Sequence, residues 1–165
     1  MIRRMGKVKK TTQSDRLFPS NLPTRQFIRF EAHGFKRPVV GVVFRGGEAY
    51  KGVPLGGIGT GHVDLDTDGT LGDCTIFNTF RPRRKLSVPF LGFTADQQAW
   101  VLSLKPFDEP TAARVAKQIE YWGHYPVADL HYETDSPLDI SLRAYSPFFP
   151  GDSLGSNTPA IIFQV

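Results

Sequence analysis

Short apolar runs that alternate with polar residues, and that end at Gly or Pro, most constrain the fold of this chain. The chain holds 16 Gly and 13 Pro, about twice the punctuation that a helical bundle tolerates. It also holds 13 Phe, and aromatic residues favour strands. Frequent turns between short apolar runs are typical of sheets. We therefore expect an all-β fold.

The apolar pattern predicts a series of strands and turns after residue 26. Strands are expected at residues 27–30, 37–44, 62–65, 71–77, 88–93, 100–104, 127–134, 138–145 and 160–165. The run at 37–44 is rich in Val and indicates a buried strand. Loops are expected at residues 81–85, 94–99 and 146–159, and Asp68-Gly69 favours a hairpin turn. For residues 110–122 a short helix and a strand both remain open.

Strand periodicity assigns side chains to the two faces of several strands. Five residues are expected to point inward: Leu130, Tyr132, Ile140, Leu142 and Ala144. In the segment that starts at His62, Val63 and Leu65 share one face. His62, Asp64 and Asp66 therefore lie on the opposite face, which we expect to be the outer one.

The positive charge of the chain is concentrated at its N-terminus. The net charge is +4, yet residues 1–16 alone carry six Lys or Arg against Asp15, and the remainder is close to −1. We expect residues 1–24 to be a disordered basic tail and linker, and residues 25–165 to form one domain. Cys74 is the only cysteine, so an internal disulfide is excluded. No secretory signal or membrane-spanning run is evident, which predicts a cytoplasmic location.

The glycine run PLGGIGTG at residues 54–61 does not fit a phosphate-binding loop. Gly52 and Gly57 have the Walker spacing, but Ile58 stands where that motif needs Lys. Gly57 and Gly59 begin a dinucleotide fingerprint, but His62 replaces its last glycine and a strand pattern follows. Close approach to another backbone or to a ligand is the better explanation.

The remaining residues show no catalytic or metal-binding constellation. Residues 64–69, DLDTDG, match the start of a calcium loop, but Thr75 occupies the position of the bidentate Glu and no helical pattern flanks it. The four His are scattered, and no nucleophile elbow surrounds a Ser. We expect no catalytic, cofactor-binding or metal-binding residues in this chain.

Three segments resemble glycoside hydrolase family 116, which includes bacterial β-glucosidases related to non-lysosomal glucosylceramidase. They are GVPLGGIGTGHVDLDTDGTLGDCTIFN at 52–78, YWGHYPVADLHYE at 121–133 and LRAYSPFFPGDSLGSNTPAIIFQV at 142–165. The segments occur in the family's order and cover most of residues 50–165.

The resemblance implies an N-terminal antiparallel β-sandwich followed by a catalytic (α/α)₆-barrel domain. The family's nucleophile Glu and acid/base Asp belong to that barrel, so no catalytic residue transfers to this chain, which we expect to be inactive alone. The chain ends inside an apolar run, and we expect the sandwich to be incomplete at its C-terminus. The parent enzyme would be a retaining β-glucosidase acting on β-glycosides through the barrel.

The glycine loop is the candidate contact of this domain with the barrel, near the sugar-binding cleft. The candidate contact residues in and beside this loop are Gly56, Gly57, Gly59, Thr60, Gly61 and His62. A glycine-rich turn within the sandwich itself is the other interpretation of the same residues.

Two other functions are consistent with parts of the sequence. A free-standing carbohydrate-binding module would use exposed aromatic residues, for which the candidates are Trp100, Tyr121, Trp122 and Tyr125. A nucleic-acid-binding protein would use the basic tail together with RPRRK at 81–85. We rank both below the hydrolase domain and expect no nucleic acid as partner.

Overall fold

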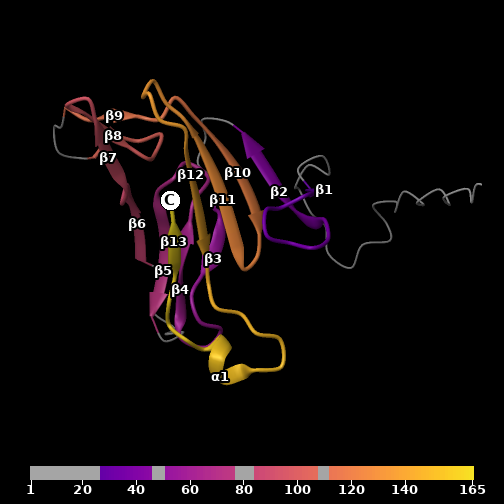
Figure 1. Ribbon diagram of the computed structural model, residues 1–165. Coiled ribbons are helices and arrows are strands. Elements are labelled where there is room, and N and C mark those ends of the chain that lie inside the picture. The colour runs from indigo at the N-terminus through magenta and orange to yellow at the C-terminus, as the bar shows by residue number, and fades with distance from the viewer. Residues whose placement is uncertain (1–26, 46–50, 77–83, 108–111) are drawn as a thin grey trace, which may run out of the picture.

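Antiparallel sheets dominate the computed structural model, which describes residues 27–45, 51–76, 84–107 and 112–165 (Figure 1). The largest sheet has the strand order β1-β2-β10-β11-β12-β13. Its strands are β1 (Phe27–Phe30), β2 (Val39–Arg45), β10 (Gln118–His124), β11 (Val127–Glu133), β12 (Ile140–Tyr145) and β13 (Ile162–Gln164). The all-β prediction is confirmed.

The other strands form two smaller sheets. The four-stranded sheet has the order β3-β4-β5-β6, with β3 (Val53–Leu55), β4 (Gly61–Leu65), β5 (Leu71–Ile76) and β6 (Arg84–Val88). The three-stranded sheet contains β7 (Gly92–Ala95), β8 (Gln98–Val101) and β9 (Arg114–Val115). The pair β8–β9 is parallel, whereas β7 and β8 form an antiparallel hairpin.

One hydrophobic core lies between the six-stranded and four-stranded sheets. It joins Val53, Leu55 and Leu65 of the smaller sheet to inward-facing residues of the larger one, namely Ile119, Tyr121, Ala128, Leu130, Tyr132, Ile140, Leu142 and Ala144. The five residues predicted to point inward from β11 and β12 are all buried. Two sheets that share one core in this way are consistent with a β-sandwich.

Residues 118–124 form a strand, which settles the open choice at 110–122 against a helix. Strand β10 pairs with β11 on one side and β2 on the other, so it is central in its sheet. Ile119 and Tyr121 point into the core, as period-two alternation requires. Pairing on both edges outweighs the weak helix propensity of this segment.

Several loop and burial predictions need correction. Residues 94–99 are no loop, because β7 and β8 run up to a two-residue turn at Asp96 and Gln97 with φ of 48° and 61°. Positive φ at both positions suits a tight hairpin, but without glycine the sequence gives no signal for it. Strand β2 is only half-buried, and Val40 is 62% exposed. The loop at 146–159 includes a one-turn helix, α1 (Ser153–Ser156), capped by Asp152.

The predictions for the basic tail at 1–24 and for Arg81, Pro82 and Arg83 fall outside the described residues. Residues 84 and 85, expected in a loop, begin β6. Among the described residues, none of the helices has the length and apolarity needed to cross a bilayer.

Candidate functional site: the glycine loop

The glycine loop, residues 56–61, leads from β3 to the first residue of β4 and packs against a segment distant in the sequence. The Ile58 amide donates to the Ser156 carbonyl (3.0 Å). The Gly59 amide donates to Asn157 Oδ1 (2.6 Å), and the Gly56 amide donates to Ser146 Oγ (2.6 Å). The loop is therefore held by three hydrogen bonds to residues 146–157.

Three glycines of the loop are required by close backbone contacts. A Cβ on Gly56 would overlap the Gly61 carbonyl oxygen. A Cβ on Gly57 would lie 2.7 Å from the Asn157 carbonyl oxygen, and one on Gly61 would overlap the carbonyl oxygen of Thr75. Gly61 also has a φ of +101°, which side chains rarely allow. A Cβ on Gly59 would meet only the Asn157 side chain, which can move. Close approach to another backbone thus explains the glycine run, and the partner lies within this domain.

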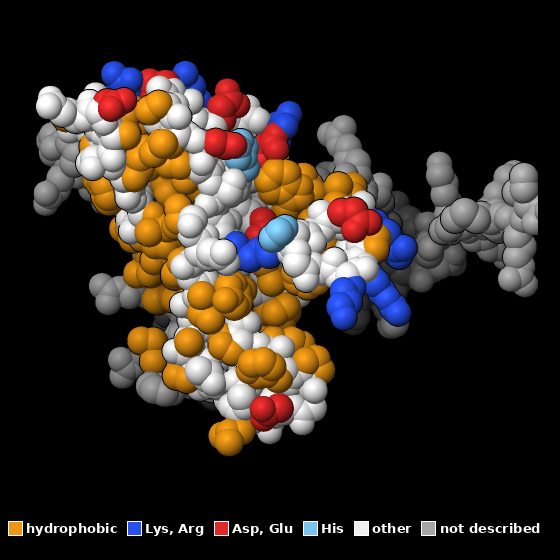
Figure 2. All heavy atoms as spheres, in the orientation of Figure 1, with side chains coloured by type: hydrophobic (Ala, Val, Ile, Leu, Met, Phe, Trp, Pro, Cys, Tyr) orange, Lys and Arg blue, Asp and Glu red, His pale blue; other side chains and the backbone are white. Residues whose placement is uncertain are grey.

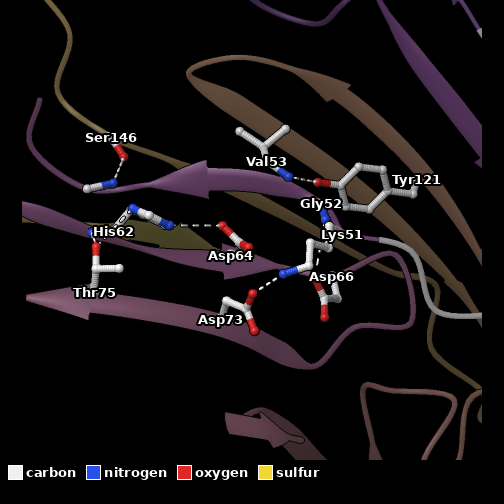
Figure 3. A network of polar contacts seen from close by, with 11 residues as sticks. Lys51, Gly52, Val53, His62, Asp64, Asp66, Asp73, Thr75, Tyr121 and Ser146 are labelled. Carbon is white, nitrogen blue, oxygen red and sulfur yellow. Dashed lines mark hydrogen bonds and ion pairs between the residues drawn. The ribbon is translucent and has the colours of Figure 1, made fainter. Parts of the chain in front are cut away.

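The other two residues of the predicted site take structural positions at the start of β4. The Thr60 amide donates to the Gly57 carbonyl (3.1 Å) and closes the turn. The His62 ring lies against Thr75 of β5, with Nδ1 3.1 Å from Thr75 Oγ1, and its Nε2 is 3.6 Å from Asp64 Oδ1 (Figure 3).

A groove of about 260 Å³ runs beside the loop. Its lining comes from residues 55–57, 60–63, 75–76 and 159–161. Five of the six predicted site residues therefore border one groove, and Gly59 lies outside its lining. The sequence does not predict that Ser146 and Asn157 hold the loop, because roughly ninety residues separate them from the glycines.

The acidic residues at 64, 66 and 68 are buried, which contradicts the expectation that Asp64 and Asp66 lie on an outer face. Asp64 is 5% exposed and Asp66 is 8% exposed. Asp66 Oδ1 accepts a hydrogen bond from the Gly52 amide (3.2 Å). Asp68 pairs with Lys105 Nζ at 2.7 Å and accepts from the Thr70 hydroxyl (2.6 Å). These bonds fix the β4–β5 hairpin, whose turn at Asp68-Gly69 is confirmed.

The polar network around Asp66 joins three strands, as Figure 3 shows. Lys51 forms an ion pair with Asp73 of β5, and the Tyr121 hydroxyl of β10 bonds to the Val53 amide (2.7 Å). In the part of the chain that the structure describes, no group of three or more His, Cys, Asp or Glu is arranged to hold a metal ion.

The pKa of Asp66 and that of Asp68 shift in opposite directions. Burial raises the pKa of Asp66, and the charges of Asp68 and Asp64 add to this, against the Gly52 amide and Lys51, which lower it. Burial also opposes ionisation of Asp68, but hydrogen bonds from Lys105 and Thr70 outweigh it and lower its pKa.

The replacement Asp66→Asn is expected to raise the melting temperature at pH 7 by a few degrees. Because the pKa of Asp66 is raised in the folded state, folding favours the protonated form, and stability is lost as pH rises through the folded pKa. Asn keeps a carbonyl acceptor for the Gly52 amide without the charge. The gain should vanish below pH 3.8, the ordinary pKa, where Asp66 is neutral in both states.

Thermal unfolding followed by circular dichroism, from about pH 3 to about pH 7 so that the interval spans the ordinary pKa of Asp, measures this effect. Asp139→Asn is the matched control, since that side chain is 86% exposed and its contact with His131 Nδ1 (3.5 Å) is screened by water, so only a small change is expected from it. A loss of stability of equal size at every pH would show that the Asp66 charge itself is needed.

A family model described as "beta-glucosidase 2, glycosyl-hydrolase family 116 N-term" matches residues 52–165, more than half of the chain. The chain belongs to this family. No curated protein and no solved structure gave a match. Membership confirms the resemblance drawn from the three sequence segments, and the first of these contains the glycine loop. A family 116 N-terminal domain implies a catalytic partner domain in the full-length protein.

This family 116 N-terminal domain exposes hydrophobic side chains at the end where the glycine loop lies. We call this the loop-end surface, and its residues are Ile58, Ile76, Phe148, Phe149 and Leu154. Leu154 of α1 is 85% exposed. Figure 2 shows hydrophobic side chains gathered at this end, where Figure 1 places α1. An apolar cluster of this kind is typical of a surface that another domain or protein covers.

Proposed function

We propose that this chain is the non-catalytic N-terminal β domain of a retaining β-glucosidase of family 116, of the β-glucosidase or glucosylceramidase type. The observation that carries the proposal is the family match over residues 52–165. The family resemblance assigns the nucleophile and the acid/base residue to an (α/α)₆-barrel domain, so this chain alone is inactive and the barrel binds the β-glycoside. A cytoplasmic location remains part of the proposal.

Within that enzyme, the loop-end surface and the glycine loop contact the catalytic domain. Support comes from the position of the loop, which is fastened at the same end as α1 by Ser156 and Asn157. It also comes from the exposure of Ile58, Phe149 and Leu154, which are 56%, 55% and 85% accessible. Burying such side chains against another domain is favourable by about 25 cal/mol per Å².

Two measurements test the proposal separately. The purified chain should release no nitrophenol from p-nitrophenyl β-D-glucoside, and hydrolysis by the chain alone would refute its non-catalytic role. The chain should also co-elute in gel filtration with a separately produced family 116 catalytic domain.

Leu154→Asp is expected to weaken that complex at least about tenfold, because it places a charge in an apolar interface. Leu138→Asp is the matched control. Leu138 is 51% exposed between β11 and β12, at the opposite end of these strands from the turn where Tyr125 packs against Phe148. Equal weakening by both variants would argue against the loop-end surface as the contact.

A further inference from the structure

A second pocket lies on the outer face of the six-stranded sheet, away from the core. Four residues that face one another in register cross this face: Trp122 on β10, Asp129 on β11, Arg143 on β12 and Gln164 on β13. They line a pocket of about 400 Å³. In Figure 2, acidic, basic and histidine side chains meet near the middle of the face shown. We call this the outer-face pocket.

The ion pair between Arg143 and Asp129 at the floor of the outer-face pocket also fixes the segment that forms one of its walls, residues 31–33. Arg143 donates through Nε and Nη2 to both oxygens of Asp129 (2.6 and 2.9 Å), and through Nη1 to the His33 carbonyl (2.7 Å). The last bond ties residues 31–33 to the sheet. The Phe30 ring packs edge-on against His124, whose Nε2 lies 3.0 Å from Asp129 Oδ2. The pocket is therefore preformed.

Polar groups remain available for a ligand after these internal bonds. Arg143 has five N–H donors, and three are used by Asp129 and His33. Among the described residues, neither the Trp122 indole N–H nor the side-chain amide of Gln164 has a hydrogen-bond partner. By contrast, the Trp100 indole donates to Asp135 (2.7 Å) and Trp100 is buried, as is Tyr121. Because both side chains are buried, neither Trp100 nor Tyr121 can stack against a sugar ring.

The charge in the pocket selects among ligand classes. Arg143 is neutralised by Asp129, whose ionisation is opposed by burial but favoured more strongly by hydrogen bonds from His124 and Arg143, so its pKa is lowered. Glu31 adds a negative charge to the lining. Among the described residues that line the pocket, Arg143 is the only Lys or Arg and it is already paired, which disfavours an anionic ligand. An aromatic ring beside fixed donors and acceptors suits a molecule with apolar C–H faces and several hydroxyls.

We propose that the outer-face pocket binds one pyranose unit of a neutral carbohydrate, stacked on Trp122 and hydrogen-bonded to Asp129, Arg143 and Gln164. This site is separate from the loop-end surface, and it does not depend on the β-glucosidase proposal. A single sugar ring in an open pocket binds weakly, so we expect a Kd on the order of 1 mM.

The two tryptophans of the chain provide the measurement. In a ¹⁵N-labelled sample, the indole N–H signal of Trp122 should shift as methyl β-D-glucopyranoside or cellobiose is added. The signal of Trp100, whose N–H is already bonded to Asp135, should stay in place and serves as the internal reference. Inorganic phosphate should shift neither signal.

Variants then locate the site. Followed by the backbone ¹⁵N–H signals of the residues that line the pocket, Trp122→Ala should weaken binding at least about tenfold. Gln164→Ala, which changes an exposed side chain, should weaken it a few-fold without altering the melting temperature. Phe149→Ala, an exposed aromatic on the loop-end surface, is the matched control and should bind as the unmodified chain does.

The proposal is overturned if the Trp122 signal does not move at sugar concentrations of about 50 mM, well above the expected Kd. It is also overturned if Gln164→Ala and folded Trp122→Ala both retain full affinity, or if phosphate binds and the sugars do not. None of these outcomes bears on hydrolysis by a catalytic domain, so failure here leaves the proposed function standing, and the reverse also holds.

Discussion

Gly61→Ala is expected to destabilise the domain by about 2–5 kcal/mol. Two costs combine at this position. Alanine disfavours the φ of +101°, and its Cβ would overlap the Thr75 carbonyl oxygen on the neighbouring strand β5. Since Gly61 faces Ile76 in the β4–β5 register, relief of the overlap requires the two strands to separate. Urea unfolding followed by fluorescence measures the loss.

Gly151→Ala separates these two costs. Gly151 has a similar φ of +90°, but a Cβ there would meet nothing within 4 Å. Gly151→Ala should therefore lower the free energy of unfolding only by the conformational cost of a positive φ, about 1–2 kcal/mol. If the two variants lose equal stability, the contact with Thr75 is unimportant and the positive φ alone explains why glycine is needed at position 61.

Tyr121→Phe is expected to cost about 1–3 kcal/mol although it removes a single oxygen. The Tyr121 hydroxyl accepts from the Val53 amide (2.7 Å) and donates to the Leu65 carbonyl (3.1 Å). It thus joins β10 of the large sheet to β3 and β4 of the small one across the core. Phenylalanine would leave a buried N–H and a buried C=O without this partner.

Tyr132→Phe is the matched control, because Tyr132 is equally buried in the same core and its hydroxyl finds no hydrogen-bond partner among the described residues. Removing that hydroxyl should be neutral or stabilising, since an unpaired buried polar group is unfavourable. Chemical denaturation of the two variants gives the comparison. A similar loss in both would mean that the inter-sheet hydrogen bonds of Tyr121 contribute little.

Local pattern was sufficient to predict the strands whose alternation is strong. Residues 127–134 and 138–145 alternate clearly, and their inward residues are buried as expected. The Asp68-Gly69 turn was also readable, because a positive φ favours glycine. The sequence does not predict the Asp96–Gln97 turn, because neither residue is a glycine, the residue type that most strongly indicates a positive φ.

The local sequence pattern did not predict that Asp64 and Asp66 are buried. Alternation places Asp64 and Asp66 opposite Val63 and Leu65, and a polar face predicts exposure to solvent. In the structure both carboxylates are buried. Asp66 accepts a hydrogen bond from the Gly52 amide with Lys51 nearby, and Asp64 lies 3.6 Å from His62 Nε2. Alternation reports which side chains share a face, but not what covers that face.

Composition, periodicity and short motifs are local properties, and they were enough to predict the fold class, the family and a close backbone approach at the glycine run. What the glycines approach, namely Asn157 and Thr75, became visible only in the folded chain. The tertiary structure alone also brought Trp122, Asp129, Arg143 and Gln164 into one row. Strand order and register are set by contacts between distant segments, and one residue of register exchanges the two faces of a strand.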